Sequence, residues 1–156
     1  MANYSKHIPL TRYVKMLQLL KERGLKGCIV EVGIGLEFSN SLLLCSGASD
    51  VILNVECPYA KTTDLSVSLK YVKKKAESAF WKTLNLCKYD PGNYFGLAIS
   101  GAHYQDRNSH TWMYFANNNN RYWLHVEIPQ NSNRLIIANK LKKVIEDFLY
   151  KILKIE

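Results

Sequence analysis

The chain has 156 residues and a net charge of +8 at pH 7, from 21 lysines and arginines against 13 acidic residues. This length suits one domain with its own core, and the 47% hydrophobic content is ordinary for a globular protein. No apolar run approaches the roughly 20 residues that a membrane helix needs, so we expect a single domain over residues 1–156 that does not span a membrane.

Cysteine usage and the N-terminal sequence indicate the compartment. The four cysteines are scattered and contain no C-x-x-C pair, so they predict neither a zinc site nor a redox motif. The first residues, MANYSKHIPLTRY, lack the apolar stretch of a secretory signal. Reduced thiols in a chain of this kind are typical of the cytoplasm. We expect a cytoplasmic protein and assign it no metal and no cofactor.

The first half of the chain alternates helical and strand patterns. A helix is predicted from Pro9 to Gly24, followed by a buried β-branched strand that ends at a glycine turn beginning with Gly33. A short helix is expected from Leu36, and the free N–H groups at such a helix start attract anions. A turn containing Ser49 and a second strand follow.

The second half predicts a long helix, three strands and a final helix. Thr62-Thr63-Asp64 offers an N-cap for a helix through about Phe80, and residues 81–87 either extend this helix or form a separate turn. The strands are expected at 94–100, 111–116 and 121–128, with an asparagine hairpin loop between the last two. A helix follows Pro129. This order predicts an α/β fold, a three-layer α/β/α sandwich with a mixed sheet.

Lysines gather in two predicted helices, at 70–75 and 140–154. A positive charge of this size is compatible with nucleic acid, with a phosphorylated small molecule, or with solubility alone. Most lysine runs on helices are solvated faces. No recognised nucleic-acid motif accompanies the charge, so we do not expect nucleic acid as a partner.

Three short motifs in a fixed order resemble those of a known family. The sequence EVGIGL at 31–36 lies where the C-terminal domain of CinA, the nicotinamide-mononucleotide amidohydrolase family, has E-S-C-T-G-G after a strand. Gly47-Ala48-Ser49 lies at its G-S-S motif, and Tyr59-Ala60-Lys61 is a contracted form of its Y-S-N-E-A-K. Later segments resemble two of its strands and its last helix, at 97–101, 111–116 and 131–149. The resemblance spans nearly the whole chain and implies a CinA-like sandwich.

The resemblance implies Ser/Lys amidase chemistry that releases ammonia from a nicotinamide nucleotide. Ser49 would be the nucleophile, Lys61 its base, and Tyr59 would assist the proton transfer. A serine needs such a base, and a lysine serves only where burial or nearby positive charge lowers its pKa. The alternative for the same residues is a turn serine and a surface lysine. The implied substrate-binding residues are Gly33, Gly35, Ser100, Gly101 and Arg134.

Departures from the family motifs favour a second function. Val32, Ile34 and Leu36 stand where the family has its first serine, its threonine and its second glycine. The loop after Gly101 lacks the family's A-G-P run. These changes are typical of a catalytically retired relative that keeps the scaffold and binds a nucleotide or a protein partner, because chemistry lives in the site and not in the scaffold. The sequence leaves both functions open.

Under either function, we expect the turns at Gly33, Ser49 and Gly101 to converge on one pocket. Open α/β sheets bind ligands at the carboxyl ends of their strands, and a glycine turn at a helix start suits a phosphate. The expected ligand is therefore a phosphorylated nucleotide. The sequence also leaves homo-oligomer formation open.

Overall fold

The computed structural model describes residues 11–33, 37–58, 67–102, 104, 106–130 and 133–155. The elements in chain order are α1 (Thr11–Glu22), β1 (Leu25–Val32), α2 (Glu37–Leu43), the 3₁₀ helix η2 (Ala48–Asp50), β2 (Ile52–Glu56), α3 (Leu69–Leu86), β3 (Asn93–Ala102), β4 (Ser109–Asn117), β5 (Arg121–Ile128) and α4 (Arg134–Ile155).

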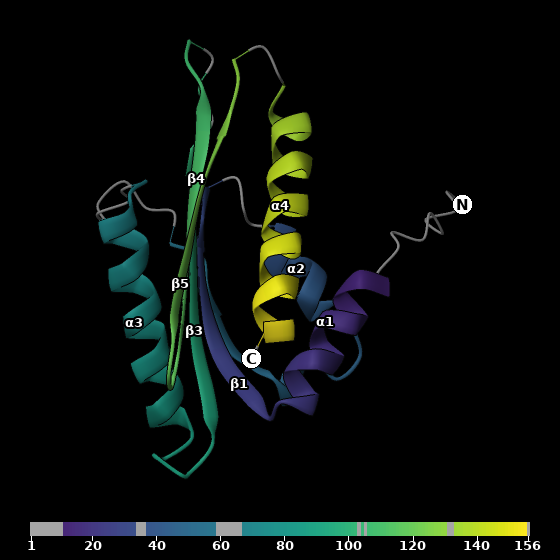
Figure 1. Cartoon of the computed structure of the whole chain (residues 1–156), viewed down its shortest axis with the longest axis vertical. Helices are drawn as coiled ribbons and strands as arrows, with labels where there is room; N and C mark the ends of the chain where they lie inside the picture. Colours follow the sequence, from purple (N-terminus) through teal and green to yellow (C-terminus); the bar gives the residue numbers. More distant parts are fainter. Residues whose placement is uncertain are drawn as a thin grey trace.

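The strands form one mixed sheet in the order β2-β1-β3-β4-β5. β1 runs parallel to β2 and β3, whereas β3, β4 and β5 are joined by antiparallel pairing. Helix α3 covers one face of the sheet, and α1, α2 and α4 lie on the other (Figure 1). The predicted three-layer α/β/α sandwich is therefore confirmed.

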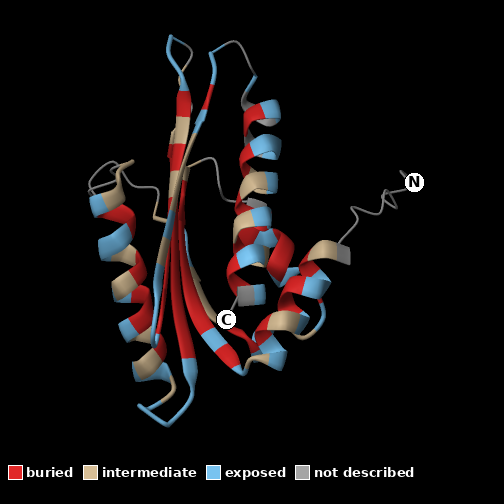
Figure 2. Cartoon of the chain, viewed as in Figure 1, coloured by how far each residue is buried: buried red, intermediate tan, exposed pale blue. Residues whose placement is uncertain are grey.

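Each face of the sheet has its own apolar core (Figure 2). On the side of α1, α2 and α4, Phe95 and Phe115 stack with ring centroids 5.4 Å apart. On the other side, α3 packs closely over β3 because Gly96 has no side chain. A Cβ atom at that position would overlap the backbone of Ala76 and Phe80.

The predicted elements agree with the structure except at the start of α3. The strand predicted at 121–128 has the bounds of β5, and its two alternating faces are confirmed because Val126 and Ile128 pack in a core beside α4. The cap predicted at 62–64 is wrong, because α3 begins only at Leu69. Its cap is Ser68, whose hydroxyl accepts a hydrogen bond from the Tyr71 N–H at 3.2 Å. Residues 81–86 continue this helix.

The asparagine run builds the β4–β5 hairpin and ties it to the start of β3. Asn117 Oδ1 accepts from the backbone N–H groups of Asn119 (3.0 Å) and Asn120 (2.7 Å), which closes the loop. Asn118 Oδ1 accepts from the Tyr94 N–H at 2.6 Å. Short side-chain amides are suited to such local backbone bonds. The run is thus structural.

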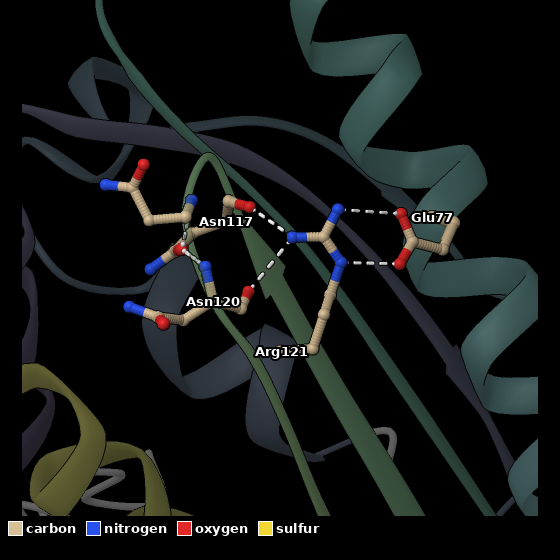
Figure 3. Close-up of polar contacts among 5 residues, drawn as sticks. Glu77, Asn117, Asn120 and Arg121 are labelled. Atoms are coloured by element: carbon tan, nitrogen blue, oxygen red, sulfur yellow. Dashed lines mark hydrogen bonds and ion pairs between the residues drawn. The ribbon is translucent and has the colours of Figure 1, made fainter.

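Arg121 fastens the same hairpin to α3 (Figure 3). Its Nε and Nη2 donate to the two carboxylate oxygens of Glu77, at 2.6 and 3.2 Å. Its Nη1 donates to the carbonyl oxygens of Asn117 and Asn120. This fork-to-fork pairing uses the planar geometry of the guanidinium.

Candidate functional site

The carboxyl ends of β1 and β3 meet at two glycines. Gly33 follows β1 with a φ of 80°, and a Cβ atom there would overlap the carbonyl oxygen of Gly101. Val32 pairs with Ser100 in the adjoining register. The structure therefore brings Gly33, Ser100 and Gly101 together, as the sequence predicted. Glycine is needed at 33 because of the nearby Gly101 backbone, and at 101 because of the nearby Thr111 side chain. Gly35 lies outside the described residues.

The helix start expected to bind a ligand anion already holds a carboxylate of the protein itself. Glu31, at the end of β1, is fully buried. Its Oε1 accepts from the Phe38 N–H at 3.3 Å and its Oε2 from the Ser39 N–H at 2.9 Å. The positive end of a helix favours negative charge, and here Glu31 supplies it. The expectation of a ligand phosphate on these two N–H groups of α2 is corrected accordingly.

Ser49 lies at the other end of the sheet. It is an exposed residue of η2, which precedes β2. The Gly27 N–H donates to the Val51 carbonyl at 2.9 Å, so η2 sits beside the amino end of β1. From Gly27 the rest of β1 extends about 20 Å to Gly33. The expected convergence of Ser49 with Gly33 and Gly101 is wrong, because a turn that precedes a parallel strand lies at its amino end.

Each of the remaining predicted site residues follows a strand in chain order. Tyr59 and Lys61 come after β2, and both lie outside the described residues. Arg134 begins α4, which follows β5, and β5 runs in the same direction as β3 because both are antiparallel to β4. Ser49 and Lys61 are thus separated along the chain by β2, whose five residues extend about 16 Å.

Two buried hydroxyls lie in this part of the molecule and were missed by sequence reasoning. Thr111 pairs with Gly101 across β3 and β4, and its hydroxyl occupies the space that a Gly101 side chain would need. Neither the Thr111 hydroxyl nor that of Ser39 has a hydrogen-bond partner among the described residues. Such groups in proteins usually bond to ordered water or to a ligand.

Two of the four cysteines are buried and unreactive. All four are free thiols, and Cys28 and Cys45 are buried. Burial raises the pKa of both thiols, which keeps them protonated and inert at neutral pH. Within the described residues, no three metal-ligating side chains come together, and no described helix is long and apolar enough to cross a membrane.

The sheet order and the helix layers define the class of protein: an α/β/α sandwich with a mixed five-stranded sheet. Solved structures with the same arrangement are CinA superfamily proteins. One from Enterobacter cloacae has a TM-score of 0.65 at 16% identity, covering 99% of this chain and 97% of that chain. One from Klebsiella pneumoniae has a TM-score of 0.63 at 12% identity, covering 94% and 98%.

A competence/damage-inducible protein from Agrobacterium tumefaciens has a TM-score of 0.60 at 15% identity, covering 93% of this chain and 94% of that chain. No family model and no curated protein matches the sequence. The chain therefore has a CinA-like fold, and the resemblance carried by its motifs is confirmed at the level of fold. At these identities the likeness carries no activity.

Proposed function

We propose that this chain is a CinA-like protein that binds a phosphorylated nucleotide without Ser/Lys hydrolysis. The observation that carries the proposal is the position of Ser49. A ligand at the carboxyl ends of β1 and β3, beside Gly33 and Gly101, is separated from the turn that holds Ser49 by most of the length of β1, about 20 Å. Nucleophilic attack needs the reacting atoms about 3 Å apart.

Other features support binding at the carboxyl ends of the strands. Open α/β sheets bind ligands there, and the Thr111 hydroxyl has a free hydrogen-bonding capacity among the described residues. Val32 ends β1 where the family motif has a serine, so the strand offers an apolar side chain in place of a hydroxyl. Because Glu31 occupies the start of α2, we assign the phosphate contact to Arg134, at the start of α4.

A second candidate is the amidohydrolase, with Ser49 as nucleophile, Lys61 as base and Tyr59 assisting. It is favoured by the order of the motifs, in which Gly47-Ala48-Ser49 is followed by Tyr59-Ala60-Lys61 as in the family that the sequence resembles. The five residues after Glu56 would have to lead Lys61 back along the full length of β2. Such a path costs the ordering of an extended segment beside an edge strand.

Calorimetric titration with nicotinamide mononucleotide and with its phosphate-free nucleoside tests the first candidate. We expect the nucleotide to bind at least about tenfold more tightly, because a charge-assisted contact to phosphate is worth about 1.5–3 kcal/mol. Arg134→Gln should remove this difference. Lys151→Gln, an exposed residue near the far end of α4, is the matched control and should leave it intact. Equal affinity for the two ligands in the wild type would contradict the proposal.

Ammonia release from the same nucleotide separates the two candidates. The binding protein should release none. Ammonia that appears with the wild type and disappears with both Ser49→Ala and Lys61→Met would establish the amidohydrolase instead, since removal of a nucleophile or its base costs several orders of magnitude in rate.

A further inference from the structure

Ring side chains form a continuous row on the α3 side of β4 and β5. Strand β5 directs alternate residues to this side, and each is paired with a β4 residue that faces the same way. Two of these cross-strand pairs are Trp112 with His125 and Tyr114 with Trp123. Tyr114 is buried, whereas Trp112, His125 and Trp123 remain partly or largely exposed.

The rings of the two strands contact one another directly. Trp112 and His125 stack with centroids 4.0 Å apart and planes 12° apart, and Trp123 lies 6.1 Å from Trp112. His110 meets His125 edge to face, with Nδ1 of the first 3.3 Å from Nε2 of the second. Burial and the neighbouring His125 lower the pKa of His110. Both effects disfavour a positive charge on the His110 ring within the stack.

The row continues into the loop between β3 and β4. Tyr104 stacks on His110 with centroids 5.9 Å apart, and the Arg107 guanidinium lies 3.9 Å from the centre of the Tyr104 ring. The ring row is thus defined as Arg107, Tyr104, His110, His125, Trp112 and Trp123. It crosses two strands and one loop without interruption.

The two faces of these strands differ in what covers them. On the side of α4, Met113 and Phe115 of β4 are fully buried in the larger core. On the other side, α3 fastens to the hairpin through Arg121 and Glu77, yet Trp123 is 56% exposed. Exposed apolar patches mark binding surfaces, and here the exposed Trp123 adjoins the half-buried rings of Trp112 and His125.

Cations border the ring row. Lys70 and Lys73 are exposed on α3, and helical spacing places both on the side of Glu77, which is the side that meets β5. The Glu77 charge is neutralised by its fork-to-fork pair with Arg121. At the loop end, the charges of Glu127 and Arg107 both act on His110, and the exposed Asp106 precedes Arg107 in the chain. The border is positive on balance, which favours an anionic partner.

We propose that the ring row binds single-stranded nucleic acid, with unpaired bases stacked on Trp123 and on the Trp112–His125 pair. Arg107 and the α3 lysines would contact the phosphates. Stacking on exposed rings combined with a basic margin is how proteins hold single strands without reading their sequence. Bases in a duplex hide their faces from such a surface. A row of six side chains is also longer than one mononucleotide needs. This proposal revises the sequence-based expectation that nucleic acid is not a partner. No sequence motif predicts such a surface.

Fluorescence anisotropy of labelled oligo(dT) of about 12 nucleotides tests the proposal on the full chain. We expect the oligonucleotide to bind, Trp123→Ala to weaken it at least about tenfold, and Trp123→Phe to retain most of the affinity, because a stacked ring is worth about 1–3 kcal/mol. Trp81→Ala is the matched control. Trp81 is 57% exposed on α3, where its ring contacts Phe80 outside the ring row, so this change should have little effect.

The charge of the border is tested by Lys73→Gln, which should weaken binding and reduce its dependence on salt. Lys143→Gln, exposed on α4 at the opposite face, should do neither. Three results would overturn the proposal: no binding of the single strand, equal losses in the Trp123 and Trp81 variants, or equal binding of a matched duplex. Competition by thymidine monophosphate at the same concentration as the oligonucleotide would also overturn it, in favour of a mononucleotide site. Unchanged thermal unfolding of each variant shows that the fold is intact.

Discussion

Gly24 and Gly33 flank β1 at its amino and carboxyl ends, and both have a positive φ, of 63° and 80°. Their surroundings differ. A Cβ atom on Gly24 would meet nothing within 4 Å, whereas one on Gly33 would overlap the Gly101 carbonyl. Gly24 therefore serves only the conformation of a turn, and Gly33 also allows two strands to approach each other. A side chain is therefore tolerated less well at Gly33, at the carboxyl end of β1, than at Gly24.

Polar groups fix the two ends in different ways. At the amino end, Asn118 and Arg121 bond to backbone and carboxylate groups while remaining in contact with solvent. At the carboxyl end, the fully buried Glu31 carboxylate holds the start of α2. Exposed polar contacts contribute little because water replaces them, whereas a buried carboxylate is costly to disturb. We therefore expect substitutions at the carboxyl end to have the larger effects.

The largest effect is expected for Gly33→Ala. Positive φ costs a non-glycine residue about 1–2 kcal/mol, and the overlap with the Gly101 carbonyl adds about 1–3 kcal/mol for overpacking. Gly24→Ala has the first cost without the second. Urea unfolding of both variants measures the two losses. If Gly33→Ala and Gly24→Ala lowered the free energy of unfolding equally, the overlap with the Gly101 carbonyl would be relieved without cost. The close approach of β1 and β3 would then not contribute to the requirement for glycine.

Glu31→Gln should come next. It keeps one oxygen acceptor but leaves an N–H group at the start of α2 facing an amide, which costs about 2–3 kcal/mol. The control is Glu22→Gln at the amino side, where the exposed carboxylate accepts a hydrogen bond from the Gln18 amide at 2.9 Å. That change should cost less than about 0.5 kcal/mol. A mild effect of Glu31→Gln would indicate that water can reach the start of α2.

Arg121→Lys is expected to cost about 1–2 kcal/mol, because lysine cannot reproduce the bidentate pair with Glu77 together with the two carbonyl contacts. A double-mutant cycle with Glu77→Gln measures how much of the loss belongs to that pair. Lys21→Met is the comparison: it breaks the exposed pair with Asp50, which should contribute less than about 1 kcal/mol. Equal losses would show that the hairpin attachment is no stronger than an ordinary surface pair.

The architecture could be predicted because it depends on local patterns. Alternation over residues 121–128 defines β5 and its two faces, and the asparagines before it define the hairpin. The sequence also contained the family motifs that match the fold. These patterns do not predict at which end of the sheet a turn lies. Gly33 and Ser49 are close in the sequence, but the parallel pairing of β1 with β2 places them at opposite ends of the strands.

Contacts between distant segments explain the rest of what was missed. The role of Glu31 depends on where α2 begins relative to β1, and no local pattern encodes that. The ring row arises because His110 and Trp112 of one strand meet His125 of another. The alternation predicted that Trp123 and His125 share a face, but only the position of α3 reveals that this face is left partly uncovered.

The smallest effect is expected for Ser49→Ala, which tests the separation of the two ends most directly. Ser49 is an exposed residue of η2, so the free energy of unfolding should change by less than about 0.5 kcal/mol. Because most of β1, about 20 Å, lies between this turn and the carboxyl ends of the strands, nucleotide affinity in the calorimetric titration should stay within about twofold of the wild type, as for distant sites that share no partner. Ser46→Ala, an exposed neighbour, should behave in the same way. A loss of affinity confined to Ser49→Ala would place the ligand at the amino end of the sheet, and the assignment of the binding site to Gly33 and Gly101 would then be wrong.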